Sequence, residues 1–206
     1  MDPRIKRSRD ALRQAMLTLI KEMDYDAIGV QDITDRANTA RVTFYRHYAN
    51  KEELLLDFLE DLYHKFAAQF QDLPASDLLD FNQEPPMQRI FEFVAQDRLL
   101  YKQLVTGPMA SMLEARLRIY FVEMTRSIDP DLTDFEANFL TSNAISSLKW
   151  WLSDDLPYSA VYMARANHWL GISGIMAMRG ELDRVTMPNP DMLAGTPYAD
   201  RVKQRP

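Results

Sequence analysis

The 206-residue chain has no cysteine, only six glycines and no long apolar run. Without cysteine there is no disulfide bond, thiolate metal site or cysteine nucleophile, which suits a reducing, cytoplasmic location. The N-terminal segment MDPRIKRSRD is charged and has no apolar core, so we expect no secretory signal. No stretch approaches the roughly 18 apolar residues that predict a membrane-spanning helix, so we also expect no membrane insertion.

The sequence also lacks the residue clusters on which most enzymes depend. His47, His64 and His168 are far apart and do not have the spacing of metal ligands. With so few glycines there is no glycine-rich phosphate-binding loop, and no Ser or Asp has a recognisable catalytic setting. The pair Asp154-Asp155 precedes Leu-Pro, which is typical of a helix end rather than of two catalytic carboxylates. We therefore expect no enzyme activity, metal site or cofactor.

Charge is distributed unevenly along the chain. Residues 1–51 contain ten Lys/Arg and seven Asp/Glu, a net charge of +3, whereas the rest contains fourteen and twenty-three, a net charge of −9. A basic N-terminal segment on an acidic body is typical of an anion-binding head on a solubilising scaffold.

Apolar residues recur with helical spacing almost throughout, and clear strand alternation is lacking, so the sequence predicts an all-α fold. Gly29 and Asn50 are expected N-caps, Asn38 is expected to end a helix in the left-handed conformation, and Thr133 with Glu136 forms a capping box. From Gly180 onward the composition predicts an irregular tail. The predicted helices cover a segment ending near 23, then 30–37, 41–47, 51–70 and, approximately, 86–96, 97–105, 108–128, 134–153 and 159–179.

The stretch RANTARVTFYRHYANKEELL, residues 36–55, mixes arginines with β-branched and aromatic residues. Two short helices separated by a tight turn at Asn38 form a helix-turn-helix, whose second helix enters the DNA major groove. Val42 and Phe44 cannot both face the core on a two-turn helix. An outward face with Arg, Thr and Tyr can read base edges and hold phosphates.

These residues resemble the DNA-binding signature of the TetR family of bacterial transcription regulators. The match lies in Ile33, Ala37, the run 43–48 and the run 51–55. Asn38 stands where the family usually has Gly, Gly29 where it often has Thr, and Ala40 where it often has Ser. Ala40 loses a side-chain cap worth about 1 kcal/mol, which Thr39 could partly replace.

The resemblance implies three segments: a three-helix DNA-binding head (1–50), a larger helical ligand-binding and dimerisation body (51–180), and the tail (181–206). The last two helices of the body, 134–153 and 159–179, would form a four-helix bundle with the same two helices of a partner chain. Packing of these two helices against each other within one chain would explain their small residues nearly as well. The implied function is a ligand-responsive transcription regulator, most simply a repressor, which binds a palindromic operator in double-stranded DNA as a homodimer. The alternative is a family relative that has lost DNA binding and regulates through a protein partner.

The resemblance also assigns roles to individual residues. Tyr45 and Lys51 would bind phosphates, Thr43 and His47 phosphate or base, and Arg41, Val42 and Arg46 would read sequence, while Phe44 would be core. The basic run Arg4, Lys6, Arg7 and Arg9 would be a flexible DNA-binding arm or a disordered end. Candidate residues for the pocket of a moderately apolar effector, each also compatible with plain core, are Tyr101, Met109, Met112, Tyr120, Phe121, Met124, Asn143, Trp150 and His168.

Overall fold

The structure is a computed structural model that describes residues 3–70 and 74–188. Over these residues the chain is α-helical, with three short 3₁₀ helices and one isolated β-bridge, which confirms the predicted all-α fold. None of the helices in this part of the chain is long and apolar enough to cross a membrane. The α-helices are α1 (Pro3–Glu22), α2 (Val30–Arg36), α3 (Arg41–His47), α4 (Lys51–Phe70), α5 (Gln88–Gln96), α6 (Arg98–Thr106), α7 (Ala110–Ile128), α8 (Asp134–Ser153) and α9 (Ala160–Arg179).

The helices pack as two compact units. The N-terminal unit comprises residues 1–67 and 97–120, and the C-terminal unit comprises residues 68–96 and 121–206. The N-terminal unit is discontinuous in sequence because α6 packs against α1. The boundaries of these packing units differ from those of the three functional segments predicted from the sequence. The functional division stays a prediction.

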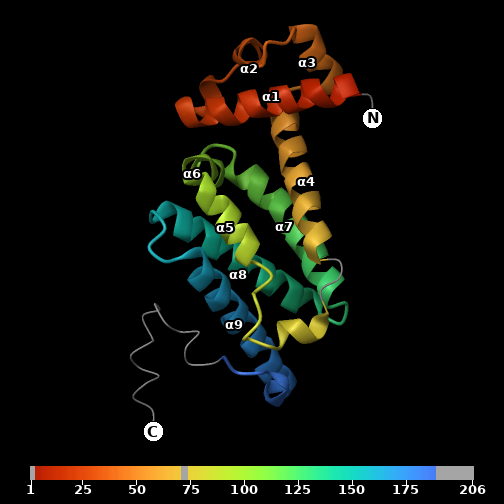
Figure 1. Cartoon of the computed structure of the whole chain (residues 1–206), viewed down its shortest axis with the longest axis vertical. Coiled ribbons are helices and arrows are strands. Elements are labelled where there is room, and N and C mark those ends of the chain that lie inside the picture. Colours follow the sequence, from red (N-terminus) through yellow and green to blue (C-terminus); the bar gives the residue numbers. More distant parts are fainter. Residues whose placement is uncertain (1–2, 71–73, 189–206) are drawn as a thin grey trace. The chain divides into compact units, whose positions relative to one another are not determined.

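In the N-terminal unit, α2 and α3 pack on α1 (Figure 1). Helical spacing predicts one buried face made of Leu12, Met16, Leu19, Ile20 and Met23. The first four are buried, whereas Met23 lies beyond the end of α1 and is 42% exposed. Helix α1 begins at Pro3, well before the expected start near Ser8 or Asp10, because proline with its fixed φ is well suited to the first helical position.

This early start corrects the expectation of a flexible or disordered basic end. Arg4, Lys6, Arg7 and Arg9 lie on the first turns of α1. Their positions are therefore set by a helix whose later turns are anchored in the core of the unit.

The turn between α2 and α3 has the geometry that the sequence predicts. Asn38 adopts a left-handed conformation with φ of 49°. The next amide, Thr39 N–H, donates to the Thr34 carbonyl at 2.9 Å, which closes the end of α2. At the start of α2, the Gly29 N–H donates to the Asp32 carboxylate at 2.8 Å. The end of α2 is thus closed by backbone hydrogen bonds, and its start by the Asp32 side chain.

The start of α3 lacks a side-chain cap. Ala40 is the N-cap, and the Thr39 hydroxyl donates to the Ala37 carbonyl instead of accepting from α3. We expect Ala40→Ser to raise the free energy of unfolding by about 1 kcal/mol, because a serine hydroxyl can accept from a free amide of the first turn. Urea unfolding followed by circular dichroism measures this change. Ala49→Ser, at another exposed alanine that caps no helix, is the control and should change it little.

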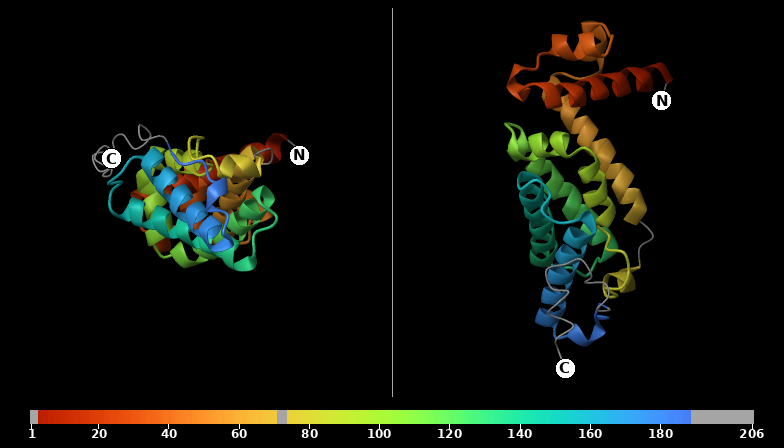
Figure 2. Two further views of the ribbon diagram at one scale, coloured as in Figure 1. Left: turned by 90° about the horizontal axis from the view of Figure 1, so that it is seen from below. Right: turned by 60° about the vertical axis from the view of Figure 1, so that its left-hand side comes forward.

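In the C-terminal unit, α9 lies between α5 and α8 and packs on both (Figure 2). Gly171 permits the close approach of α8 and α9, since a Cβ atom there would come within 2.6 Å of Leu140 Cδ2. Phe91 of α5 meets Trp151 of α8 edge to face, with ring centroids 5.3 Å apart. Part of the small-residue pattern of 159–179 therefore serves packing within one chain.

The predicted capping box at the start of α8 is present. The Thr133 N–H donates to Glu136 Oε2 at 2.9 Å, and the Glu136 N–H donates to Thr133 Oγ1 at 3.2 Å. Glu136 also accepts two hydrogen bonds from Arg179 at the end of α9, at 2.8 and 2.7 Å. One carboxylate thus caps α8 and ties it to α9.

Residues 181–188, the first part of the tail that the sequence predicts to be irregular, are held on the C-terminal unit. A 3₁₀ turn (Leu182–Arg184) leads to Val185, which is buried with Phe81 and Met176. The Phe81 N–H donates to the Thr186 carbonyl at 3.1 Å, and the Thr186 N–H donates to the Leu79 carbonyl at 2.7 Å. The rest of the predicted tail, 189–206, lies outside the described residues.

Candidate nucleic-acid interface and ligand cavity

Helix α3 has one buried face and one solvent-exposed face. Phe44 is fully buried, whereas Val42 is 67% and Tyr45 is 53% exposed, and Arg41 and Arg46 are exposed too. We call Arg41, Val42, Tyr45 and Arg46 the α3 face. Exposed Val and Tyr side chains between two arginines form a surface that can contact thymine methyls, base edges and phosphates.

Thr43 and His47, the other predicted contacts on α3, are half-buried. His47 Nε2 lies 2.9 Å from the Ser8 hydroxyl of α1. Burial lowers the pKa of His47, and the neighbouring Arg9 and Arg46 lower it further. In the chain without DNA the imidazole therefore favours its neutral form, which can donate one hydrogen bond and accept another.

Lys51, the predicted phosphate ligand at the start of α4, is engaged within the N-terminal unit. Its ammonium donates to the Tyr25 carbonyl at 2.8 Å and to the Ile28 carbonyl at 2.9 Å, and it lies 4.3 Å from the centroid of the Tyr25 ring. An ammonium has three donors. Two of them fix the 3₁₀ turn Tyr25–Ala27, which leaves one for a phosphate.

The orientation of α3 depends on a residue that the sequence reasoning missed, Asp57 of α4. Its carboxylate accepts from the Tyr48 hydroxyl at 2.6 Å, from Arg13 Nε at 2.7 Å and from Arg9. Burial, followed by the hydrogen bond to Asp57, raises the pKa of Tyr48 to about 12, so the phenol remains a donor. Together these side chains join α1, the end of α3 and α4.

The sequence did hold a signal for this network. Arg9 and Arg13 are one helical turn apart, as are Asp57 and Asp61, so each pair lies on one helix face. Arg13 also reaches Asp61 at 3.5 Å. Only the fold shows that the two faces meet, so the prediction that Arg9 belongs to a DNA-binding arm gives way to a role in positioning α3.

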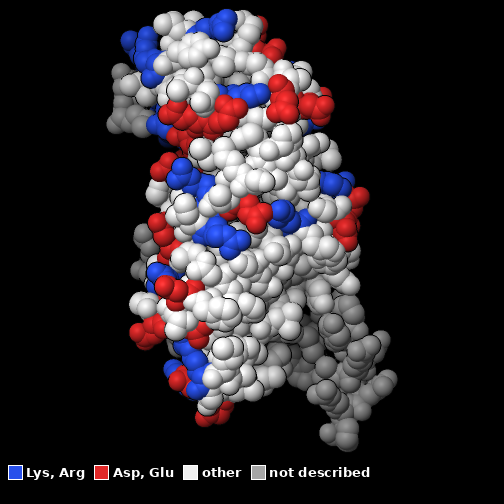
Figure 3. Space-filling model, turned by 180° about the vertical axis from the view of Figure 1, so that it is seen from behind, with Lys and Arg blue, Asp and Glu red and all other residues white. Residues whose placement is uncertain are grey.

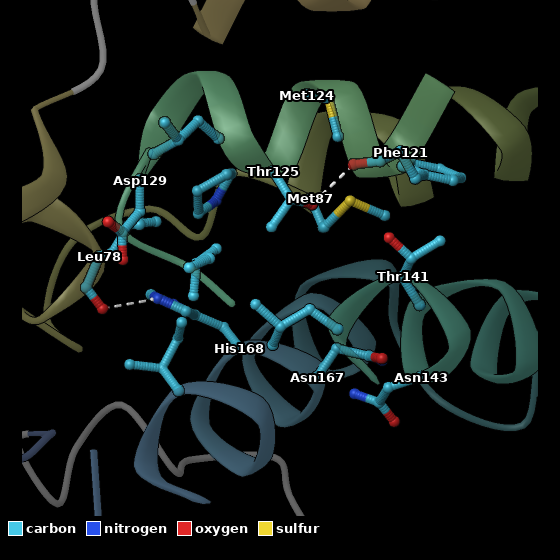
Figure 4. Close-up of a pocket in the computed structure, with 16 residues that line it drawn as sticks. Leu78, Met87, Phe121, Met124, Thr125, Asp129, Thr141, Asn143, Asn167 and His168 are labelled. Atoms are coloured by element: carbon cyan, nitrogen blue, oxygen red, sulfur yellow. Dashed lines mark hydrogen bonds between the residues drawn. The ribbon is translucent and has the colours of Figure 1, made fainter. Parts of the chain in front are cut away.

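The C-terminal unit contains a cavity of about 110 Å³ between its helices (Figure 4). Its wall comes from Leu78, from Pro86 and Met87 before α5, from α7, α8 and α9, and from residues 129 and 132 between α7 and α8. The wall is mostly apolar. Four of the nine predicted ligand-binding residues line it: Phe121, Met124, Asn143 and His168.

The structure does not bring the other five candidates to this cavity. Tyr101 is buried in the N-terminal unit, where Met112 is half-buried and Met109 borders a small pocket beside Tyr25. Tyr120 stacks on Tyr63 with ring centroids 4.3 Å apart. Trp150 is 44% exposed, with its ring centroid 6.1 Å from that of Tyr158. Helical periodicity says that these residues face a core or a surface, and only the packing decides which one.

The cavity wall also contains polar residues that the sequence analysis does not predict, among them Thr141 and Asn167. Both are buried polar residues on helix faces that are otherwise apolar, and such a position in the sequence can indicate a polar group in a cavity wall. The His168 ring meets the Phe81 ring edge to face, with ring centroids 5.2 Å apart. Its Nε2 forms a hydrogen bond of 2.8 Å with the Leu78 carbonyl. Burial lowers the pKa of His168, so it is neutral at pH 7.

Residues 12–58, from α1 into α4, match the family of bacterial regulatory proteins named after tetR. The N-terminal part of this chain therefore matches the DNA-binding domain of the TetR family.

One protein related in sequence and two solved structures are similar to this chain. The uncharacterized HTH-type transcriptional regulator YxbF of Bacillus subtilis (strain 168) is 48% identical over 61 residues, which are 29% of this chain and only 16% of that protein. A TetR transcriptional regulator from Streptococcus agalactiae 2603V is similar over 82% of this chain and 96% of its own, with 26% identity and a TM-score of 0.58. A tetR-family regulator from Streptomyces coelicolor shares the fold, with 20% identity and a TM-score of 0.60 over 95% of this chain and 97% of its own.

The departures of this chain from the usual TetR-family signature have different structural outcomes. Asn38 keeps the left-handed turn, so it replaces the usual Gly without loss of geometry. Ala40 leaves α3 without a side-chain cap. The helix that carries the α3 face is therefore held mainly by Phe44 and by the Asp57 network.

Proposed function

We propose that this TetR-family protein is a ligand-responsive repressor that binds a palindromic operator as a homodimer, in the cytoplasm, where bacterial DNA lies. The observation that carries the proposal is the α3 face. It presents Arg41, Val42, Tyr45 and Arg46 to solvent, while Phe44 and the Asp57 network hold the helix from behind. A second helix of a helix-turn-helix, fixed in this way, is built to lie in a major groove.

The roles on the α3 face follow from side-chain chemistry. Arg41 and Arg46 can each bind a guanine edge or a phosphate, Val42 can contact a thymine methyl, and the Tyr45 hydroxyl can donate to a phosphate. Thr43, His47 and the third donor of Lys51 stand at the border of this surface. They complete the proposed DNA-contact set.

An exposed apolar surface on the last two helices supports a homodimer. The outer side of α8 carries Phe135 and Phe139, and that of α9 carries Leu170 and Met178, the last two each 73% exposed. Gly174 lies beside them and has no neighbour within 4 Å of a Cβ atom. On the face shown in Figure 3, the C-terminal unit has a broad area without charged side chains. A two-fold dimer through this surface matches a palindromic operator.

The cavity supports the ligand response. A ligand that prefers one shape of the C-terminal unit shifts the population of dimers, and only one spacing of the two heads fits both half-sites. The alternative hypothesis is regulation through a protein partner without DNA contact. Two observations favour it: α3 has no side-chain cap, and the Lys51 ammonium donates to backbone carbonyls of its own unit.

Selection of bound duplexes from a random DNA pool, with the purified full chain at stated salt, tests the proposal. We expect an enriched palindrome, with affinity that falls steeply as salt rises. A folded dimer that enriches no sequence, both alone and after addition of a cell extract that could supply a co-repressor, would favour the protein-partner alternative.

Removing one arginine of the α3 face gives a sharper result. We expect Arg46→Ala to weaken binding to the selected operator by about 1–3 kcal/mol, since one base or phosphate contact is lost. Arg36→Ala is the matched control: Arg36 lies in the same motif, but its guanidinium donates twice to Glu22, at 2.9 and 2.6 Å. Fluorescence anisotropy measures both variants, and equal losses would show that only net charge matters.

A further inference from the structure

Three buried polar atoms gather in the wall of the cavity without a hydrogen-bond partner among the described residues. They are Thr141 Oγ1, Asn167 Oδ1 and His168 Nδ1. The three residues are 1%, 8% and 9% exposed, and all of them line the cavity (Figure 4). Buried polar atoms are nearly always paired, so three unpaired ones around one cavity point to a molecule that pairs them.

The other bonds of these side chains define what each free atom can do. His168 Nε2 faces a carbonyl oxygen, Leu78 O, and must carry the hydrogen; the neutral ring then leaves Nδ1 as an acceptor. The Asn167 amide donates its N–H to the Met163 carbonyl at 2.8 Å, so its Oδ1 is an acceptor as well. The Thr141 hydroxyl can accept or donate. The free atoms are therefore mainly acceptors, which call for a ligand with N–H or O–H groups.

The charge of the wall points the same way. Asp129 lines the cavity, and the described lining residues include no Lys or Arg. The guanidinium of Arg179 lies 3.9 Å from the Asp129 carboxylate, but it already donates two hydrogen bonds to Glu136. An anionic ligand would lose its hydration here without gaining a cation, which is strongly unfavourable.

The remaining wall sets size and shape. Phe121, Met124 and Ile172 supply apolar surface, and methionines adapt to irregular ligands. An apolar cavity of about 150 Å³ holds benzene, so a cavity of about 110 Å³ whose methionine side chains can move suits a ligand with one apolar group up to the size of a phenyl ring.

We propose that the cavity binds a small, mostly apolar molecule that presents hydrogen-bond donors, is uncharged or cationic, and is not a carboxylate or phosphate. Thr141, Asn167 and His168 are the residues that select it. This inference deepens the ligand response of the proposed function and rests on it only for the biological role of the ligand.

Four probes with one phenyl skeleton test the ligand class: benzyl alcohol, benzylamine, toluene and benzoate. Their affinities for the full chain, without DNA, can be measured by ligand-observed NMR titration. We expect the alcohol and the amine to bind roughly threefold to tenfold more tightly than toluene, as one or two hydrogen bonds require. Benzoate should bind most weakly. Benzoate binding as tightly as the alcohol, or no binding by any probe at millimolar concentration, would overturn the proposal.

Two threonines of the wall provide a matched pair of variants. Thr141→Val removes the free hydroxyl, whereas Thr125→Val removes one that already donates to the Phe121 carbonyl at 2.7 Å. We expect Thr141→Val to abolish most of the preference for benzyl alcohol over toluene while leaving the melting temperature equal or higher, because an unpaired buried hydroxyl is lost. Thr125→Val should keep the preference. Asn167→Leu should reduce it as Thr141→Val does.

The outcomes separate this inference from the proposed function. If the donor preference and its loss in Thr141→Val are found, but benzyl alcohol and benzylamine do not change operator affinity, the ligand class stands and the effector role fails. If the preference is unchanged in both Thr141→Val and Asn167→Leu, the selection proposed for the cavity is wrong, whatever the chain does with DNA.

Discussion

Replacing Asp57 with alanine is expected to lower the free energy of unfolding by about 3 kcal/mol, the lower end of the range for breaking a buried ion pair. The side chain is only 15% exposed, and the change removes the acceptor shared by Tyr48, Arg9 and Arg13. Tyr48 follows α3 directly, so the end of that helix loses its link to α1 and α4. We therefore expect operator affinity to fall by more than about tenfold, although the Asp57 side chain lies behind the α3 face and outside the proposed DNA-contact set.

Asp61→Ala is the control for this prediction. Asp61 lies one turn further along α4 and pairs with the same Arg13 at 3.5 Å and with Lys65 at 2.9 Å, but its side chain is 39% exposed. An exposed pair contributes less than about 1 kcal/mol. Urea unfolding and anisotropy titration distinguish the two variants. Similar losses in both would mean that acidic charge on α4 matters, and not the position of Asp57.

Glu136→Gln should have the second large effect, in the C-terminal unit. Glutamine can keep a hydrogen bond to Thr133 but loses the charged double contact with Arg179. We expect the free energy of unfolding at pH 7 to fall by about 2–3 kcal/mol, less than for a fully buried pair, because Arg179 is partly exposed. Glu181→Gln, at an exposed pair with Arg184, should change little.

The same ion pair predicts a dependence of stability on pH. The hydrogen bonds from Arg179 lower the pKa of Glu136 from 4.5 to about 2 in the folded chain. A carboxyl with a depressed pKa binds protons more readily when unfolded, so its contribution is complete above pH 4.5 and is lost as the pH falls toward 2. Unfolding experiments across this window should show a shallower decline for Glu136→Gln than for the parent chain. Equal slopes would place the acid sensitivity elsewhere.

Local signals in the sequence predicted most of the fold. The caps at Asn50 and Thr133, the left-handed Asn38 and the buried face of α1, apart from Met23, each depend on residues close in the chain, and the structure confirms them. Helix α1 begins earlier than predicted, because Pro3 can occupy the first position of a helix. The split of the chain into two packing units was also not foreseen, since contacts such as that of α6 with α1 join distant segments.

The candidate sites show the same limit. The α3 face could be inferred because seven consecutive residues divide between core and solvent on one short helix. The cavity could be inferred only in part, because its wall is assembled from five separate segments. The residue type of Trp150 predicts a place in the pocket, but its side chain lies at the surface, whereas the roles of Thr141 and Asn167 depend on neighbours that are distant in the sequence.

The exposed apolar side chains of α8 and α9 have a consequence for dosage. If two chains must pair through Phe135, Phe139, Leu170 and Met178 before they fit a palindrome, dilution favours the single chain by mass action. The concentration of pairs then grows with the square of the concentration of single chains. Occupancy of the operator would respond more than proportionally to the number of copies in a cell, so a modest change in expression could switch a promoter.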